Sequence, residues 1–158
     1  MLLYHGSNVE VSNPQIFESD RRLDFGKGFY LTSSYEQAKR WAELTVKRRG
    51  SGKEAVSVFA FDESAVSDLR VLHFTQAQKE WLEYVTMNRK NQTIQNDNYD
   101  IVIGPVANDK TMPVISLYFS GIYDIEETIK RLMPQKLFDQ YTFRTEKAIK
   151  KLKFVEVK

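Results

Sequence analysis

The chain has 158 residues, of which 42% are hydrophobic, 13% aromatic and 28% charged, and its formal net charge is +2. This composition is typical of a folded protein and excludes a mainly disordered chain, and the small net charge gives no sign of nucleic-acid binding by bulk electrostatics. The absence of cysteine excludes disulfides, thiol catalysis and thiolate metal sites, and the two histidines are too few for a histidine-rich metal site.

Length and hydropathy predict a single domain over residues 1–158, located in the cytoplasm. No apolar run approaches the length of a membrane span, and residues 1–5 lack the basic segment and following apolar segment of a secretion signal. We therefore expect a protein that binds neither a membrane nor a metal ion.

The first part of the chain predicts three strands and one helix. The strands are expected at residues 2–5, 29–32 and 55–61, where short β-favouring runs end at turn residues. The helix is expected to begin after Ser33 or Ser34, because Ser33 with Glu36 and Ser34 with Gln37 both have capping-box spacing. It should end at the glycines of 50–52. Residues 9–23 have no clear period and are expected to form a connector.

The remaining part predicts further strands separated irregularly by helices. Strands are expected at residues 69–74, 99–103, 137–144 and 153–157. Helices are expected after Thr75 with Gln78, around Pro113, over 124–132, and after Thr145 as a cap. A turn is expected at Gly104 and the proline that follows it. Because strands and helices do not alternate strictly, the pattern favours an α+β fold over a doubly wound sheet.

Three segments carry residue types suited to chemistry. They are His5-Gly6-Ser7, the run Gly26-Lys27-Gly28-Phe29-Tyr30 with Trp41 eleven residues later, and the strand segment that begins at Gln140. Each has an ordinary structural interpretation as well: a strand end with a turn, core aromatics, and a solvated glutamine. The glycine run fits neither a phosphate-binding P-loop nor a dinucleotide fingerprint, because the required spacing and residues are missing.

Together and in this order, the three segments resemble ADP-ribosyltransferases of the diphtheria-toxin and poly(ADP-ribose) polymerase class. In that class, a His-Gly-Ser/Thr on a first strand, a Gly-x-Gly-x-Tyr on a second strand and an acidic residue on a late strand form the active site. The chain is still more similar to an uncharacterised bacterial family, through the segments 5–7, 24–30, 103–107 and 143–148. The resemblance implies a split β-sandwich, with two antiparallel sheets around an NAD cleft and peripheral helices.

The resemblance also implies a role for each matching residue. Gly6 would hold the nicotinamide carboxamide through its backbone N–H and C=O. Ser7, the last residue of the His-Gly-Ser segment, belongs to the same NAD-binding set. Tyr30 and Trp41 would sandwich the cationic nicotinamide ring. His5 would bind the adenosine ribose. Two further NAD contacts, from Arg21 and Arg22 to the pyrophosphate, are inferred from their charge alone.

At the third position, the sequence departs from the pattern of the class. A glutamate there binds the ribose 2′-OH and stabilises the oxocarbenium-like transition state by its charge, whereas Gln140 keeps only the hydrogen bond. Losing such a charge costs on the order of 2–4 kcal/mol of transition-state stabilisation, by analogy with an oxyanion-hole donor. Glu146 could supply a carboxylate, but its place directly after Thr145 favours a role in the first turn of a helix.

The first hypothesis is therefore an NAD-dependent mono-ADP-ribosyltransferase that transfers ADP-ribose to a protein or nucleic-acid acceptor and releases nicotinamide. NAD would be its substrate, and a neutralising protein partner is considered because the class includes toxins. The second hypothesis, motivated by Gln140, is an NAD- or nicotinamide-binding module of the same fold without catalysis. A third is a nucleic-acid-directed protein that uses a basic helix face, made of Lys39, Arg40, Lys47 and Arg48.

Overall fold

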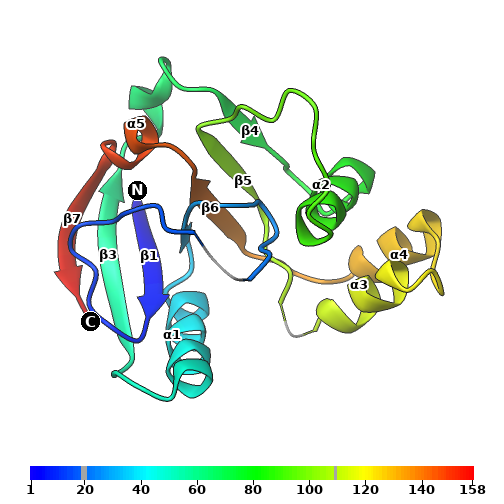
Figure 1. Ribbon diagram of the computed structural model, residues 1–158, viewed down its shortest axis with the longest axis horizontal. Helices are drawn as coiled ribbons and strands as arrows, with labels where there is room; N and C mark the ends of the chain where they lie inside the picture. The colour runs from blue at the N-terminus through cyan, green and yellow to red at the C-terminus, as the bar shows by residue number, and fades with distance from the viewer. Residues whose placement is uncertain (19–20, 109) are drawn as a thin grey trace.

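The computed structural model describes residues 1–18, 21–108 and 110–158. These residues form one seven-stranded sheet in the order β4-β5-β6-β2-β1-β3-β7, with helices packed against it (Figure 1). The strands are β1 Leu2–Ser7, β2 Phe29–Thr32, β3 Ala55–Phe61, β4 Val71–His73, β5 Ile101–Pro105, β6 Asp139–Phe143 and β7 Leu152–Val157. The helices are α1 Tyr35–Arg49, α2 Lys79–Arg89, α3 Met112–Phe119, α4 Ile125–Leu132 and α5 Glu146–Ile149, with a 3₁₀ turn at Glu63–Val66.

The sheet is mixed, so the α+β class expected from the sequence is confirmed. Neighbouring strands run antiparallel except β4 and β5, which are parallel. The described strands join into one sheet, where the sequence led us to expect two. The join is narrow at its centre, because β1 and β2 pair at a single position, Tyr4 with Thr32. Figure 1 shows β1, β3 and β7 on one side of this join and β4, β5 and β6 on the other.

Several predicted helix boundaries are confirmed by their capping contacts. Ser34, and not Ser33, caps α1, and its Oγ accepts from the backbone N–H of Gln37 at 3.2 Å. The helix ends at Gly50, which has a left-handed conformation. Asp124 caps α4 and Thr145 caps α5 by the same type of bond. Side-chain acceptors at these positions satisfy backbone donors that a helix start otherwise leaves unpaired.

Three predicted boundaries are wrong. Strand β1 continues through Gly6 and Ser7, where we expected a turn, because both residues pair with β3. Strand β5 continues through Gly104 and Pro105, where we expected a turn, because these residues pair with Gln140 and Asp139 of β6. The packing is close there: a Cβ on Gly104 would lie 3.0 Å from Phe25 and 3.1 Å from Phe74. Helix α2 begins at Lys79, and the Gln78 before it makes no capping side-chain bond, so the capping box expected from Thr75 does not form. Tertiary packing overrides the local turn and cap signals at these places.

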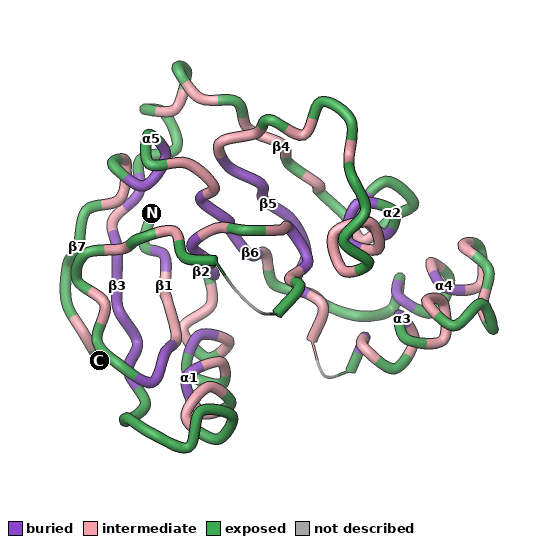
Figure 2. The backbone as a smooth tube through the Cα atoms, in the orientation of Figure 1, coloured by how far each residue is buried: buried purple, intermediate pink, exposed green. Residues whose placement is uncertain are grey.

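The strand register separates the residues of the central strands onto two faces of the sheet. One face, which we call the helix face, carries Tyr4 and Gly6 of β1, Tyr30 and Thr32 of β2, and Gln140 and Thr142 of β6. Helices α1 and α2 lie over this face. The opposite face holds an apolar cluster that includes Leu3, Phe29, Leu31, Phe59 and Phe143. Figure 2 shows that the middle strands β3, β5 and β6 are largely buried between these layers.

Helix α1 lies against β1 at Gly6, so closely that no side chain fits there. A Cβ on Gly6 would lie 1.8 Å from the carbonyl oxygen of Ala38 and 2.9 Å from the backbone nitrogen of Ala42. Both alanines are fully buried on α1. Gly6 therefore lets the helix backbone rest directly on the strand. No helix in the described part of the chain is long and apolar enough to cross a membrane.

The contact between Gly6 and α1 predicts a large loss of stability in Gly6→Ala. The new methyl group would have to push the backbone of α1 away from β1, and overpacking of this kind costs about 3 kcal/mol at its usual upper end. Urea unfolding of the variant and of Ser7→Ala, the adjacent control on the same strand, would measure this cost. We expect a change below about 1 kcal/mol in Ser7→Ala, as for most mild substitutions. Equal stability of Gly6→Ala and the wild type would contradict the close packing.

Candidate functional site

The backbone of Gly6 is directed at the junction between β1 and β2. On the next strand, Val56 exchanges both of its backbone hydrogen bonds with Lys158, at 2.8 and 2.9 Å, on the side of β3 away from β1. The Gly6–Val56 pair must therefore be of the non-hydrogen-bonded kind. Because the N–H and C=O of one strand residue point the same way, those of Gly6 point toward β2.

Strand β2 does not continue its ladder to Gly6. The pairing stops at Tyr4 and Thr32, and in continued register Gly6 would have paired with Tyr30. Instead, the carbonyl oxygen of Tyr30 accepts a hydrogen bond from Nδ1 of His5 at 2.7 Å. We call this interrupted junction, from His5 and Gly6 to Tyr30, the β1–β2 seam. It leaves the peptide groups of Gly6 directed into the seam, where strand pairing has ended.

The imidazole of His5 is held in one orientation and one tautomer. Its ring stacks on Phe29 with 4.3 Å between ring centroids and 28° between ring planes. Since a carbonyl oxygen can only accept, Nδ1 carries the proton of the neutral ring and Nε2 is left as an acceptor. Burial lowers the pKa of His5, the hydrogen bond to Tyr30 opposes this shift, and the charge of Arg49 adds to the lowering. His5 is therefore a neutral hydrogen-bonding group near pH 7.

Tyr30 anchors the loop that precedes its own strand. Its hydroxyl donates to the carbonyl oxygen of Gly26 at 2.6 Å and accepts from the backbone N–H of Phe25 at 3.0 Å. Burial raises the pKa of Tyr30, and the negative charge of Asp24 raises it further, so the phenol stays protonated. As a residue, Tyr30 is partly exposed and lies on the helix face of the sheet. Its hydroxyl is already engaged in two hydrogen bonds.

Gln140 lies in a buried polar cluster and is not a solvated strand residue. Its side chain is 3% exposed, and its Nε2 donates to Oδ2 of Asp24 at 3.1 Å. The other carboxylate oxygen of Asp24, Oδ1, accepts hydrogen bonds from Nε and Nη2 of Arg89, each at 2.6 Å. We call these three residues the Asp24–Arg89–Gln140 cluster. It joins the loop before β2 to helix α2 and strand β6.

The residues expected to form one site do not all come together. His5 lies on the opposite side of the sheet from Tyr30 and Gln140, because Tyr4 and not His5 is in register with Thr32. Trp41 is partly exposed on α1, and within the described part of the chain it makes no ring contact with Tyr30. Ser7 is buried at 8% exposure.

A group of basic residues lies near the end of β1. Arg21 and Arg22, expected to meet a pyrophosphate, are both exposed. Partial burial lowers the pKa of Arg48, and the charges of Arg21 and Arg49 lower it further, which places these side chains near one another. Arg49 also donates to Oδ1 of Asn8 at 3.2 Å. The expected basic residue Arg21 is therefore accompanied by two arginines from the last turn of α1.

Sequence reasoning missed Asp24 and Arg89, although both now lie beside Gln140. Asp24 was part of the matched segment 24–30, and this was the one sequence signal for it. Arg89 stands at the end of α2, where a basic residue is expected for the helix dipole alone, so no local signal distinguished it.

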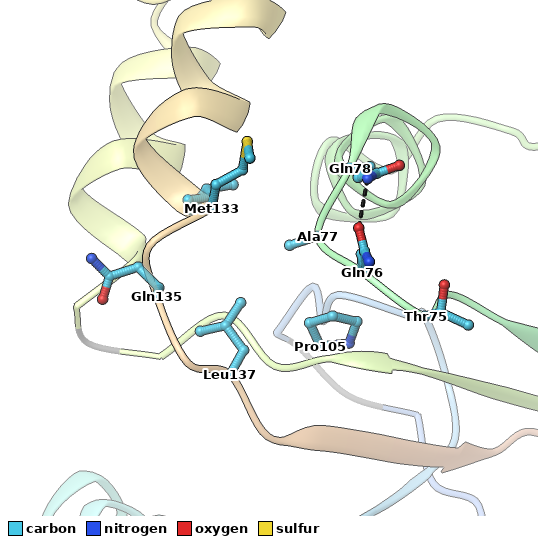
Figure 3. A pocket seen from close by; sticks show the side chains of 9 residues that line it. Thr75, Gln76, Ala77, Gln78, Pro105, Met133, Gln135 and Leu137 are labelled. Carbon is cyan, nitrogen blue, oxygen red and sulfur yellow. Dashed lines mark hydrogen bonds between the residues drawn. The ribbon is translucent and has the colours of Figure 1, made fainter.

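Two cavities, described by their linings, lie away from the β1–β2 seam. One, of about 300 Å³, is formed where the segment before α2, the end of β5 and the segment after α4 meet; Figure 3 shows Gln76, Gln78 and Gln135 around its apolar floor. The other, of about 330 Å³, lies between residues 12–15, α5 and β7 and includes Glu146. Neither lining contains Gly6, Tyr30 or Gln140. The described residues also include no group of three or more His, Cys, Asp or Glu side chains placed to hold a metal ion.

The lowered pKa of His5 predicts a loss of stability on mild acidification. The unfolded chain has the ordinary histidine pKa of 6.5 and the folded protein a lower one, so the unfolded state binds more protons between these two values. Stability is therefore full above pH 6.5 and falls as the pH is lowered through that window. Melting temperatures between pH 7.5 and 5.5 should show this fall in the wild type.

Two variants separate His5 from other titrating groups. His5→Asn keeps a donor to the Tyr30 carbonyl but cannot be protonated, so its melting temperature should change less over this range. His73→Asn removes the other, exposed histidine and should retain the fall of the wild type. The same pH dependence in His5→Asn as in the wild type would show that His5 does not titrate in this window.

The comparisons with known proteins identify a family without a described activity. A family model described as "Protein of unknown function (DUF3990)" matches residues 1–154, so the chain belongs to this family. Neither the curated proteins nor the solved structures contain a match to it.

Proposed function

We propose that this member of the DUF3990 family is an NAD-dependent mono-ADP-ribosyltransferase. In this reaction, the bond between ribose C1 and the nicotinamide nitrogen breaks, and its electron pair stays on the departing nicotinamide. A nucleophile of a protein or nucleic-acid acceptor bonds to C1 and loses its proton. The reaction needs a site that holds the nicotinamide carboxamide, stacks on its ring and stabilises the developing oxocarbenium ion.

The observation that carries the proposal is the direction of the Gly6 peptide groups. They point into the β1–β2 seam beyond the last pair of its ladder, Tyr4 with Thr32. An adjacent N–H and C=O match the C=O and NH₂ of a carboxamide, so two hydrogen bonds could form without a side chain. Close packing alone would also explain the glycine at position 6, since α1 leaves no room for a Cβ. Close packing does not, however, explain why the β1–β2 ladder ends before Gly6.

The finer fold expected from the resemblance belongs to this proposal. The single pair between β1 and β2 divides the sheet into β4-β5-β6-β2 and β1-β3-β7. We infer that these halves correspond to the two sheets of a split β-sandwich, joined at one point. The cleft for NAD would then follow the β1–β2 seam.

The side chains around the seam suit the two ends of a dinucleotide. The ring of Tyr30, a partly exposed residue, would stack on the cationic nicotinamide, and Trp41 would be the second aromatic wall. His5, on the other side of the sheet, offers Nε2 as an acceptor for a ribose hydroxyl. Arg21, with the two arginines at the end of α1, would neutralise the pyrophosphate.

A catalytically inactive NAD-binding module of the same fold is the second candidate. The observation that favours it is that Gln140 is neutral, buried and already bonded to Asp24. Such a module would bind NAD or a nicotinamide analogue and release no nicotinamide in the presence of any acceptor. This outcome separates it from the transferase.

Nicotinamide release from NAD tests the proposal directly. Tyr30→Ala removes the stacking partner of a desolvated cationic ring, an interaction of about 2 kcal/mol, so kcat/KM should fall roughly 30-fold. His5→Ala removes the ribose acceptor and should also lower kcat/KM. Unchanged turnover in both variants would refute this site.

Tyr123→Ala is the matched control for Tyr30→Ala. It deletes a phenol that is also partly exposed, but one that lies on the segment between α3 and α4 against Arg131. Its turnover should equal that of the wild type. Melting temperatures of all three variants would show whether a loss of activity reflects unfolding.

A further inference from the structure

The carboxylate of Asp24 is the buried charge nearest to Gln140. Asp24 is 5% exposed and stands 116 positions from Gln140, yet its Oδ2 lies 3.1 Å from Nε2 of that side chain. A charged group is rarely buried this far unless it is paired, and Asp24 is paired with Arg89. The loop before β2 therefore brings a negative charge to the strand position where the sequence itself has none.

The contact determines which way the amide of Gln140 points. A carboxylate paired with a guanidinium can only accept hydrogen bonds, so Gln140 must present its NH₂ group to Asp24. The carbonyl oxygen of the amide is then directed away from Asp24. This oxygen is the acceptor that Gln140 can offer to a hydroxyl group.

Arg89 orients Asp24 without covering the oxygen that faces Gln140. Nε and Nη2 of Arg89 both contact Oδ1 of Asp24, whereas Oδ2 of Asp24 contacts Gln140. The side chain of Arg89 is 25% exposed and that of Asp24 is 5% exposed, so water screens the positive end of the pair more than the negative end. Seen from Gln140, the pair is a fixed dipole with its negative end toward the amide.

The cluster lies beside the residues of the proposed nicotinamide site. Gln140 is in register with Thr32, and the next pair on the same face is Tyr30 with Thr142, about 7 Å along the strands. The hydroxyl of Thr142 in that pair is buried and lies close enough to the Tyr30 hydroxyl to lower the pKa of that phenol. The cluster is therefore next to the aromatic residue of the proposed site.

We propose that Asp24, clamped by Arg89, is a positioning residue that orients Gln140 and supplies the negative charge that position 140 lacks. This inference rests on the proposed NAD chemistry. The developing positive charge on the ribose is stabilised by the amide oxygen of Gln140, which the Asp24 carboxylate polarises through the N–H···O bond. Asp24 itself does not touch the substrate.

An exchange of the two side chains tests this arrangement. Asp24→Asn keeps the shape and removes the charge, so kcat for nicotinamide release should fall roughly 10- to 100-fold, as it does when a partner that orients a reacting group is lost. The double variant D24N/Q140E returns one carboxylate to the same pair of positions. Its kcat should recover to within about threefold of the wild type.

Asp97→Asn is the matched structural control. Asp97 forms the other partly buried pair, with Arg144, at 2.7 Å and with both side chains 15% exposed, and it does not contact Gln140. Asp97→Asn should lower the melting temperature at least as much as Asp24→Asn does. It should leave kcat within about twofold of the wild type. An equal fall of kcat in both variants would show that Asp24 acts only through stability.

A binding measurement separates this inference from the proposed function. The negative end of the pair should favour the cationic ring of NAD⁺ over the neutral ring of NADH. D24N should therefore reduce the ratio of the Kd for NADH to the Kd for NAD⁺. If the wild type binds and cleaves NAD but D24N keeps the kcat and this ratio, the inference is wrong and the function stands. If D24N/Q140E stays as slow as D24N, the inference is also wrong. If the wild type binds neither nucleotide, the function fails and the inference with it.

Discussion

The interruption of strand pairing after Tyr4 and Thr32 is the constraint on which the other features depend. A regular ladder would have used the peptide groups of Gly6 and Tyr30 to pair with each other. The His5 imidazole instead bonds to the Tyr30 carbonyl and stacks on Phe29. The two strands thus stay joined at the seam, and the Gly6 peptide groups are directed at a stretch where the ladder with β2 has ended. Under the proposed function, the carboxamide of NAD would bind there.

The loop before β2 connects the seam to the Asp24–Arg89–Gln140 cluster. Its conformation is held by the Tyr30 hydroxyl, which bonds to both Phe25 and Gly26, and by the ring of Phe25, which packs against Gly104. The same loop carries Asp24 to Gln140. A single short segment therefore orients an aromatic ring on one strand and an amide on another, and rigid support of this kind is what a reacting group requires.

The sequence allowed the local structure to be predicted well, because it depends on neighbouring residues. The alternation of β6 placed Gln140 and Thr142 on one face, and the register of that strand confirms it. The Ser34 cap and the Asp124 helix start follow from side chains three residues from the donors that they satisfy. The errors at Gly104 and Thr75 arose where a distant aromatic or a neighbouring strand outweighed the local signal.

What the sequence determined by itself is the set of elements and the residue types for which we propose binding of a carboxamide, a ring and a ribose. What only the tertiary structure decided is which of them face one another. A shift of one residue in the β1–β2 register would have put His5 on the face of Tyr30, and no local pattern specifies that register. The partner of Gln140 is likewise a residue 116 positions away, brought there by the packing of α2 on the sheet.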